Sequence, residues 1–286
     1  MTWNIVDRTV VITGGNSGIG FATATELARR GASVVLTART PERGGAAADR
    51  IEAETGQTVT PMVLDLGSFD SIRSFAGDLA STHGGVDVLV NNAGGYVSPR
   101  RVTADGYEWT IGVNHLGPFL LTCLLASDHE TLPSRIVNVA SEMHRSAKHD
   151  LGFSGLEPTG RYRGTEAYAR SKLANILFTK ELARRLEGTG SATFSLHPGV
   201  VATRIAQDGD SRLASLLWKA GARWMRTPEE GAATSIYLVT EPDIESLSGS
   251  YFSDERPIEP NEAALDDGAA VRLWDESVAA TECRTP

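Results

Sequence analysis

The sequence predicts an α/β protein with a doubly wound fold, in which helices cover both faces of a seven-stranded, mostly parallel sheet. Short runs of β-branched and apolar residues alternate with longer segments of helical spacing, and this alternation indicates βαβ crossovers. The short runs are almost continuously apolar, as expected of strands that are buried on both faces. The expected strands are, in chain order, 9–13, 33–37, 60–65, 86–90, 135–140, 192–196 and 249–252.

The composition is that of a globular protein with a large core. The 286 residues are 41% hydrophobic and 22% charged, and no repeat, low-complexity tract or Gly/Ser linker divides them. We therefore expect a single domain over residues 1–286, in which the residues after about 200 add a cap and the last strand.

Charge and cysteine content exclude several kinds of protein. The net charge of −9 disfavours nucleic acids and anionic membranes as partners, because both select basic surfaces. Cys123 and Cys283 are too few for a secreted disulfide framework. The first residues lack a signal-peptide pattern, and the longest apolar stretch, 116–126, is shorter than the ~20 residues of a membrane helix. We expect a cytoplasmic protein without a transmembrane segment.

A glycine-rich turn follows the first expected strand directly. It reads TGGNSGIG (13–20) and leads into a helical pattern, which is the context that a dinucleotide-binding turn requires. Glycines let the backbone turn tightly and approach a pyrophosphate, whose charge then lies at the helix N-terminus. A purely structural turn is the alternative, but the polar residues between the glycines favour phosphate binding. The candidate residues in this turn are Gly14, Asn16, Ser17, Gly18 and Gly20.

The residue after the second expected strand indicates which dinucleotide binds. The chain reads LTAR there, with Ala38 and Arg39 in place of the usual ribose-binding acid. A guanidinium can pair with a 2′-phosphate that a carboxylate would repel. The sequence therefore predicts NADP(H) as cofactor in preference to NAD(H).

Tyr168 and Lys172 lie at i and i+4 of a helical pattern that continues to Leu186, so they should share one helix face. A phenol has a pKa near roughly 10 in water, and a neighbouring cation favours the phenolate. The pair could therefore serve as an acid or base near neutral pH. Taken alone, the spacing is more often that of a surface pair of amphipathic side chains.

Further short motifs follow the expected strands, and together they identify a family. Asp65 and Leu66 follow the third strand, NNAG (91–94) the fourth, Ser141 the fifth and HPGVVAT (197–203) the sixth. With TGGNSGIG and YARSK (168–172), the chain resembles the short-chain dehydrogenase/reductase family, and RIVNVAS, SKLANILFTKELARRL and GSYFSDERPIEP are similar to its retinol dehydrogenase and carbonyl reductase branch. The resemblance implies a Rossmann fold that binds NAD(P).

The resemblance also implies the catalytic roles. Tyr168 would exchange a proton with the substrate oxygen, and Lys172 would lower the proton affinity of the phenol and bind the nicotinamide ribose. Ser141 would hold the substrate oxygen as an oriented donor. Asn114, in the helical pattern TIGVNHLG, would fix a water molecule that links Lys172 to solvent.

Cofactor contacts follow from the same resemblance. They would comprise the turn at the pyrophosphate, the residues at the adenosine 2′-phosphate, the adenine and the ribose, and the pocket for the nicotinamide. The implied residues are Gly14, Ser17, Ile19, Gly20, Arg39, Asp65, Leu66, Asn92, Ala93, Gly94, Tyr168, Lys172, Pro198, Gly199, Val201 and Thr203.

These features predict an NADP-dependent oxidoreductase that interconverts an aldehyde or ketone with an alcohol. A dehydratase or epimerase of the same fold, and a catalytically silent NADP-binding regulator, are the alternatives. The substrate would be a small, apolar molecule, and a homo-oligomer is compatible with the sequence.

Two further expectations concern the histidines and residues 204–227. No histidine stands at metal-ligand spacing, so we predict no metal. His144 and His149 lie in a polar segment where we expect them to be solvated, although one of them could lie near the substrate. The stretch 212–226 has an apolar helical stripe opposite basic residues. In the family this region commonly forms a substrate lid, here expected at about 204–227, although a fixed cap or a membrane-touching helix fits the same pattern.

Overall fold

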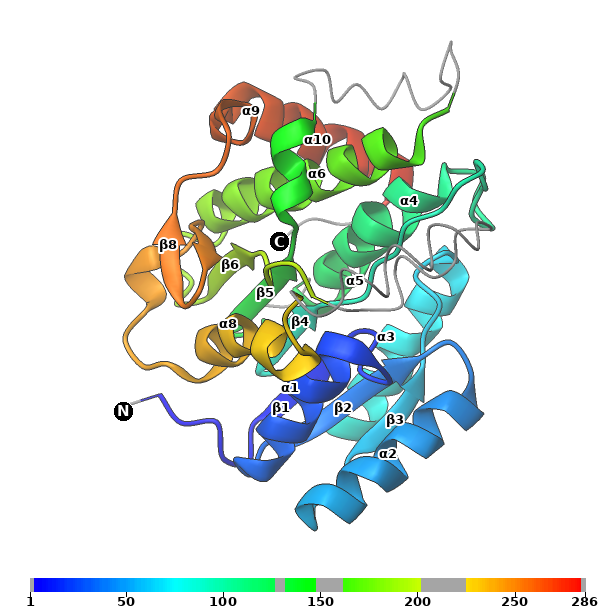
Figure 1. Ribbon diagram of the computed structural model, residues 1–286, viewed down its shortest axis with the longest axis vertical. Coiled ribbons are helices and arrows are strands. Elements are labelled where there is room, and N and C mark those ends of the chain that lie inside the picture. The colour runs from blue at the N-terminus through cyan, green and yellow to red at the C-terminus, as the bar shows by residue number, and fades with distance from the viewer. Residues whose placement is uncertain (1–2, 127–131, 148–161, 202–224, 284–286) are drawn as a thin grey trace.

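The computed structural model describes residues 3–126, 132–147, 162–201 and 225–283. Its strands form one sheet in the order β3-β2-β1-β4-β5-β6-β7-β8, and all neighbours are parallel except β7 and β8. All of the expected strands are present, which confirms the doubly wound α/β fold (Figure 1). Their bounds are β1 Thr9–Ile12, β2 Ser33–Ala38, β3 Thr60–Val63, β4 Val88–Asn91, β5 Arg135–Val139, β6 Ala192–Leu196 and β7 Tyr251–Ser253.

The sheet has one strand more than the sequence predicts. Strand β8, Arg256–Ile258, pairs antiparallel with β7 through a two-residue turn. The turn residues, Asp254 and Glu255, both have positive φ angles, of 51° and 62°. Asn-Gly is the usual sequence for such a turn, so the hairpin gives only a weak sequence signal. The count of seven strands was therefore one too few.

Strand β3 differs from the expected burial pattern because it is an edge strand. Thr60, Pro61 and Val63 are exposed, although the sequence suggested burial on both faces. Proline has no N–H to donate to a neighbouring strand, which suits an edge position.

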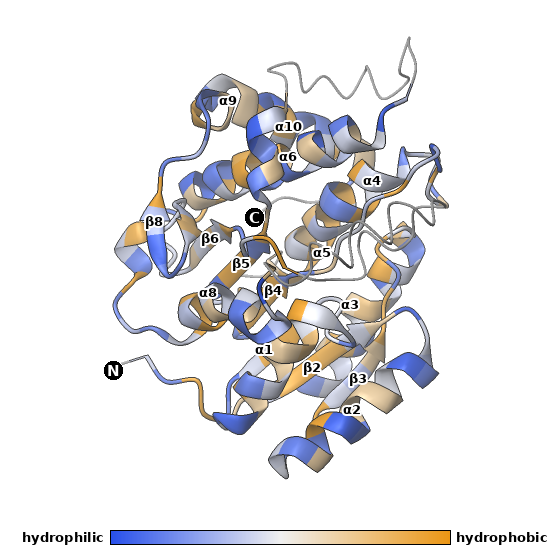
Figure 2. Cartoon of the chain, in the orientation of Figure 1, coloured by the Kyte–Doolittle hydropathy of each residue, from blue (hydrophilic) through white to orange (hydrophobic). Residues whose placement is uncertain are grey.

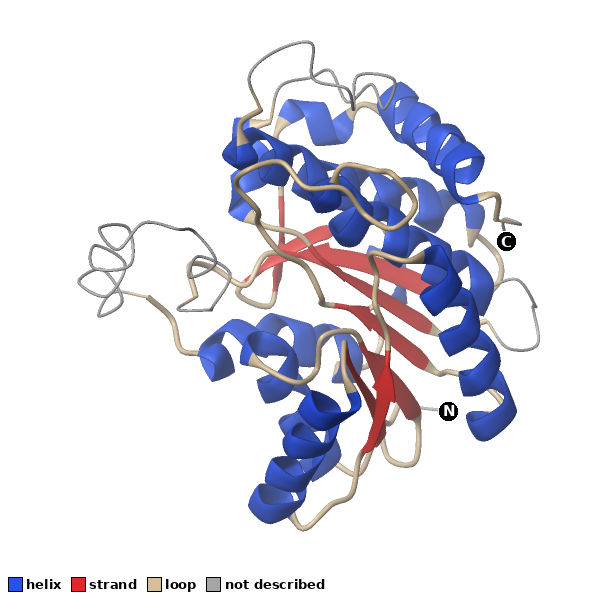
Figure 3. Cartoon of the chain, turned by 90° about the vertical axis from the view of Figure 1, so that its right-hand side faces the viewer, coloured by secondary structure: helices blue, strands red, loops and turns tan. Residues whose placement is uncertain are grey.

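Helices form a layer on each side of the sheet (Figure 3). One layer contains α1 (Gly18–Arg29), α2 (Pro41–Thr55) and α8 (Pro228–Thr240), and α1 packs on both others. The second layer contains α3 (Phe69–His83), α5 (Gly117–Leu125) and α6 (Gly164–Arg185), with α10 (Asp267–Thr281) packed against α6.

The core is correspondingly divided in two by the sheet. Val10 and Ile12 of β1 belong to the core beneath α1 and α8, whereas Val11 belongs to the core beneath α3, α5 and α6. This alternation follows from the two-residue period of a strand. In Figure 2 the strands are mostly orange, whereas helices such as α2 carry both colours.

The segment before α5 is not a regular helix. A short α4, Trp109–Ile111, leads into a π-helix, Gly112–Leu116, which continues into α5. Three short helices complete the described elements, namely η2 (Glu142–Ser146), η6 (Glu245–Leu247) and α9 (Glu262–Leu265). Within the described ranges, no helix is both long and apolar enough to cross a membrane. Thr203, His149 and nearly all of the expected lid lie outside the described residues.

Candidate active site

The motifs that follow the strands meet at one edge of the sheet. Because β1, β4, β5 and β6 are parallel and in register, their carboxyl ends lie side by side, with Ile12 paired to Val90, Asn91 to Asn138 and Val139 to Leu196. Ligands of open α/β sheets bind at this edge. The register thus brings the glycine turn, NNAG, Ser141 and the HPG turn to one place.

The glycine turn packs closely against the NNAG segment. A Cβ atom at Gly20 would lie 2.4 Å from Asn92 Nδ2 and 2.6 Å from the Gly14 carbonyl oxygen. The same Asn92 Nδ2 donates to the Thr13 carbonyl oxygen at 2.8 Å, and the Ala93 N–H donates to Thr13 Oγ1 at 2.9 Å. The two loops are therefore held together by hydrogen bonds and admit no larger side chain at Gly20.

The turn also has features suited to an anion. Gly14 and Gly18 have positive φ angles of 65° and 56°, which glycine adopts without strain. Ser17 is the N-cap of α1 but makes no side-chain capping bond, and α1 has no acidic residue in its first turn. The first N–H groups of a helix lack partners within it and attract phosphate. These residues fit the pyrophosphate of a dinucleotide.

The adenosine end of the expected site is open to solvent. Arg39 follows β2 and is exposed, and Asp65 follows the neighbouring β3 and is exposed as well. One carboxylate oxygen of Asp65 accepts the Gly67 N–H at 2.9 Å. Leu66 is buried against Gly117, where a Cβ atom would lie 2.5 Å from the Leu66 carbonyl oxygen.

Ser141, Tyr168 and Lys172 form a connected group at the end of β5. Ser141 is the N-cap of η2, its Oγ accepts the Met143 N–H at 3.2 Å, and its hydroxyl lies near the Tyr168 phenol, whose pKa it lowers. Lys172 is buried, and its Nζ donates to the Val139 carbonyl oxygen at 2.8 Å. The Lys172 Nζ lies 5.6 Å from the centre of the Tyr168 ring. Both groups lie on the same side of α6, as the spacing predicts.

Burial has a strong effect on the proton affinities of this group. It raises the pKa of Tyr168, and the hydrogen bond from Ser141 lowers that pKa in part. Burial also lowers the pKa of Lys172 to about 8. The sequence suggested that Lys172 lowers the proton affinity of the phenol. That role stays a prediction, and a pKa of about 8 means that Lys172 can itself lose its proton near neutral pH.

Asn114 lies in the π-helix and is buried. Its Nδ2 donates to the Gly95 carbonyl oxygen at 2.9 Å and to Ser171 Oγ at 3.0 Å, and its Oδ1 accepts the Gly95 N–H at 2.8 Å. Gly94 is close by, since a Cβ atom there would lie 3.1 Å from Asn114 Oδ1 and 3.3 Å from Lys172 Nζ. The amide N–H groups of Asn114 thus join Gly95, the residue after the NNAG segment, to Ser171 of α6.

The HPG turn after β6 approaches the glycine turn from the α8 side. His197 Nδ1 accepts the Gly199 N–H at 3.2 Å, and Gly199 has a φ angle of 77°. A Cβ atom at Gly231, in α8, would lie 2.7 Å from Val201 Cγ2 and 3.3 Å from Ile19 Cγ1. The side chains of Val201 and Ile19 therefore both lie against Gly231. Pro198, three residues before Val201, is partly buried.

Three side chains near this group were not singled out as site residues from the sequence. The Tyr96 ring meets the Tyr168 ring edge-on at 6.3 Å, and Tyr162 donates to Glu108 Oε1 at 3.0 Å. His144 is completely buried, whereas the sequence suggested a solvated side chain. Its neighbours come from the C-terminal part of the chain, so no local pattern could have indicated its burial.

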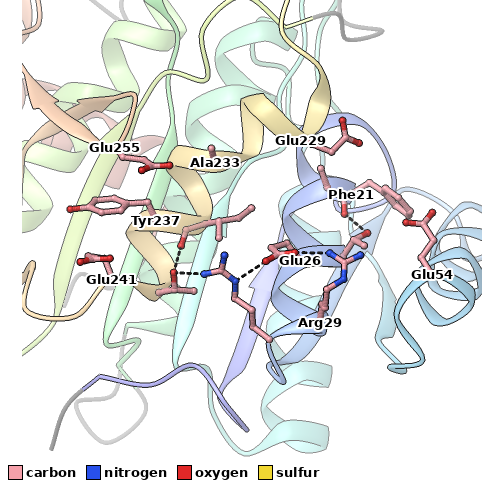
Figure 4. Close-up of a pocket in the computed structure, with 14 residues that line it drawn as sticks. Phe21, Glu26, Arg29, Glu54, Glu229, Ala233, Tyr237, Glu241 and Glu255 are labelled. Carbon is pink, nitrogen blue, oxygen red and sulfur yellow. Dashed lines mark hydrogen bonds and ion pairs between the residues drawn. The ribbon is translucent and has the colours of Figure 1, made fainter.

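A cavity between α1 and α8 is separate from this group (Figure 4). Phe21, Glu26 and Arg29 of α1 and Ala233 and Tyr237 of α8 line it, and none of the expected catalytic residues does. Elsewhere, no group of three or more His, Cys, Asp or Glu side chains within the described ranges could hold a metal ion.

The sheet edge with its glycine cradle defines a dinucleotide-binding α/β protein. The sequence profile described as "short chain dehydrogenase" matches residues 8–213, and the chain belongs to the short-chain dehydrogenase/reductase family. It is accordingly an oxidoreductase that acts on CH–OH groups and uses NAD(P)(H), with a small molecule as substrate.

Individual relatives agree with this assignment. The chain is 44% identical over 272 residues to retinol dehydrogenase 11 of Mus musculus, which covers 94% of this chain and 85% of that one. A crystal structure of an uncharacterised protein from Mycobacterium paratuberculosis has 35% identity and a TM-score of 0.79, with 100% of both chains covered. A gluconate 5-dehydrogenase-like protein from Beutenbergia cavernae, solved with bound NADP at low occupancy, has 30% identity and a TM-score of 0.66, covering 87% of this chain and 95% of that one.

Proposed function

We propose that this chain is an NADP-dependent oxidoreductase that interconverts an apolar aldehyde or ketone with its alcohol, with Tyr168 as the proton donor and acceptor. The observation that carries the proposal is the proximity of the Ser141 hydroxyl to the Tyr168 phenol, with Lys172 buried on the same helix face as Tyr168 and the glycine cradle at the same sheet edge. A proton donor, an oriented hydroxyl and a dinucleotide cradle are the parts that carbonyl reduction needs.

The residues of the chain divide the work of proton transfer. The bound dinucleotide supplies or accepts the hydride at the substrate carbon. Tyr168 gives its phenolic proton to the substrate oxygen during reduction and takes it back during oxidation. Ser141 orients that oxygen and stabilises charge on it. Lys172, whose pKa is lowered to about 8 by burial, gains or loses a proton near neutral pH and can return one toward the phenol.

We assign the cofactor contacts along the edge of the sheet. Arg39 would bind the 2′-phosphate through charge-assisted hydrogen bonds, and this contact supports NADP(H) over NAD(H). Asn114 would hold Gly95, the residue after the NNAG segment, and fix a water molecule that links Lys172 to solvent. The other contacts would come from Gly14, Asn16, Ser17, Gly18, Ile19, Gly20, Asp65, Leu66, Asn92, Ala93, Gly94, Tyr168, Lys172, Pro198, Gly199, Val201 and Thr203, of which Thr203 lies outside the described residues.

The substrate class is proposed from the relatives and from the aromatic wall beside Tyr168. Mouse retinol dehydrogenase 11 shares 44% identity over 94% of this chain. The Tyr96 ring next to Tyr168 offers an apolar surface to a substrate at the phenol. We therefore propose a retinoid-like or other apolar carbonyl compound. The acidic composition and the two free cysteines support a cytoplasmic location.

A substrate panel tests the proposal directly. Retinal, long-chain aldehydes and short polar aldehydes are each incubated with NADPH and with NADH, and the absorbance of the reduced nicotinamide is followed. We expect turnover of the apolar aldehydes with NADPH, and its loss in Tyr168→Phe without loss of NADPH binding. Equal turnover by Tyr168→Phe, or no oxidation of NADPH by any carbonyl compound, contradicts the proposal.

A further inference from the structure

His144 is a completely buried imidazole three residues after Ser141. It lies in η2, the short helix that Ser141 caps, and its ring packs edge-on against the Tyr251 ring of β7 at 5.0 Å. A polar side chain in such a place must find hydrogen-bond partners, because burying it without them costs free energy. The hydrogen-bond partners of the ring therefore indicate which of its nitrogens carries a proton.

Both ring nitrogens of His144 have partners. Nδ1 lies 2.8 Å from the Ser141 carbonyl oxygen, and Nε2 lies 3.3 Å from the backbone nitrogen of Asn261. A carbonyl oxygen only accepts and a backbone N–H only donates. Nδ1 therefore carries the proton and Nε2 presents its lone pair, which makes the ring neutral. The Tyr251 hydroxyl also lies 3.4 Å from Nδ1.

The charged surroundings of the ring agree with a neutral form. Burial lowers the pKa of His144, and Arg145 and His197 lower it further, whereas the hydrogen bond to Ser141 and the charge of Glu142 raise it. A proton on Nε2 would also point at the N–H of Asn261. The ring thus holds one tautomer, with a fixed donor aimed at the catalytic serine turn.

The segment after β8 holds this turn at three points. Asn261 meets the ring through its backbone N–H, and its Nδ2 donates to the His144 carbonyl oxygen at 3.3 Å. Arg145 Nη2 donates to the Glu259 carbonyl oxygen at 2.9 Å. Asn261 is itself fixed as the N-cap of α9, where its Oδ1 accepts the Ala264 N–H. The serine turn therefore rests on residues more than 100 positions away.

We propose that His144 is a positioning residue, which through its Nδ1–H holds the Ser141 backbone so that the Ser141 hydroxyl meets Tyr168 and the substrate oxygen. This inference rests on the proposed function, since it assigns His144 a role in the reaction that Ser141 and Tyr168 perform. The neutral imidazole connects the segment 259–261 to the Ser141 backbone through two hydrogen bonds, so this segment determines where the serine lies. The effect belongs to the chemical step, because the hydrogen bonds recorded for the His144 ring join it to Ser141, Tyr251 and Asn261, none of which is assigned to the cofactor.

Three substitutions separate the two hydrogen bonds from simple packing. His144→Leu removes both. His144→Asn keeps a donor at the place of Nδ1, and His144→Gln keeps an acceptor near the place of Nε2. Leu186→Ala serves as a stability control, because this buried leucine caps α6 about 27 Å along the helix from Tyr168. For each protein, kcat, KM, the NADPH dissociation constant and Tm are measured.

We expect His144→Leu and His144→Gln to lower kcat about tenfold while NADPH binding changes less than about twofold, since misplaced catalytic groups lose rate rather than cofactor affinity. His144→Asn should recover kcat to within about threefold of wild type. Leu186→Ala should lower Tm and leave kcat unchanged.

Other outcomes overturn the inference. A kcat for His144→Leu within about twofold of wild type contradicts it, and so does a kcat for His144→Asn as low as that of His144→Leu. If kcat follows Tm across all variants, including Leu186→Ala, the role of His144 is structural. Ser141→Ala distinguishes this failure from that of the proposed function. Full activity of Ser141→Ala refutes the assigned site, whereas loss of activity there with normal His144→Leu refutes only the role of His144.

Discussion

Replacing Gly20 with alanine should damage both stability and cofactor binding, because the glycine turn has no room for a methyl group. The new Cβ atom would lie 2.4 Å from Asn92 Nδ2 and 2.6 Å from the Gly14 carbonyl oxygen. The Asn92 amide cannot move away without losing its 2.8 Å hydrogen bond to the Thr13 carbonyl oxygen. The clash must therefore be relieved by a shift of the turn itself.

The size of the effect follows from these contacts. Overpacking costs about 1–3 kcal/mol, and loss of the Asn92 hydrogen bond costs about 1 kcal/mol more. The free energy of unfolding should fall by about 2–4 kcal/mol, which corresponds to a Tm lower by roughly 3–7 °C. The NADPH dissociation constant should rise by about tenfold or more, because the displaced N–H groups no longer converge on the pyrophosphate.

Gly45→Ala is a matched control on the neighbouring helix. Gly45 lies inside α2, and a Cβ atom there would meet nothing within 4 Å. Alanine should stabilise this helix by about 0.5–1 kcal/mol without affecting NADPH binding. Thermal unfolding and nicotinamide fluorescence titration measure both quantities. A Gly20→Ala protein with the Tm of wild type and normal NADPH binding would refute the close packing of the glycine turn against the NNAG segment.

Three further predictions address the cofactor, the proton donor and the pH dependence of stability. Arg39→Ala should raise the NADPH dissociation constant by about 10- to 100-fold and leave that of NADH unchanged, since a hydrogen bond to a charged group contributes about 1.5–3 kcal/mol. An equal loss of affinity for both cofactors in a fluorescence titration would contradict this prediction. Tyr168→Phe should lower kcat by at least about 100-fold in steady-state assays while NADPH still binds, and retention of more than about a tenth of wild-type kcat would exclude Tyr168 as proton donor. Burial lowers the pKa of His115 to about 3, so the unfolded chain takes up this proton first as pH falls. The free energy of unfolding should therefore decline below pH ~6.5 by up to about 1.4 kcal/mol per pH unit, down to the pKa of His115 in the folded state. Urea titrations at several pH values should show a shallower decline for His115→Leu. An equal decline in both proteins would disprove the contribution of His115.

The sequence was sufficient to predict where seven strands lie along the chain and which residues follow their carboxyl ends, because both depend on local patterns. Hydrophobic runs specify buried strands, and parallel register then brings the ends of β1, β4, β5 and β6 together. The hairpin of β7 and β8 was missed because Glu255 stands where the usual turn pairs, Asn-Gly and Asp-Gly, have a glycine.

Side-chain surroundings were harder to predict than strands. Asn114 in a helical pattern suggested a regular helix, whereas it lies in a π-helix with its amide bonded to Gly95 and Ser171. His144 was expected in solvent, but Tyr251 and Asn261 enclose it. Contacts between residues so far apart in the chain leave no periodic signal, so the burial of His144 could be found only from the three-dimensional structure.

The packing of α10 on α6 has a consequence for how the protein is made. Trp274 of α10 stacks on Phe178 of α6, with ring centres 6.0 Å apart, and also meets Phe119 of α5. During synthesis the helix that carries Tyr168 is complete long before α10 leaves the ribosome, and it must expose Phe178 to solvent until then. Exposed apolar surface of this kind promotes aggregation and chaperone binding. Ribosome-bound chains that stop before residue 267 should therefore bind chaperones and resist proteases poorly, and both properties should reverse once Thr281 has emerged.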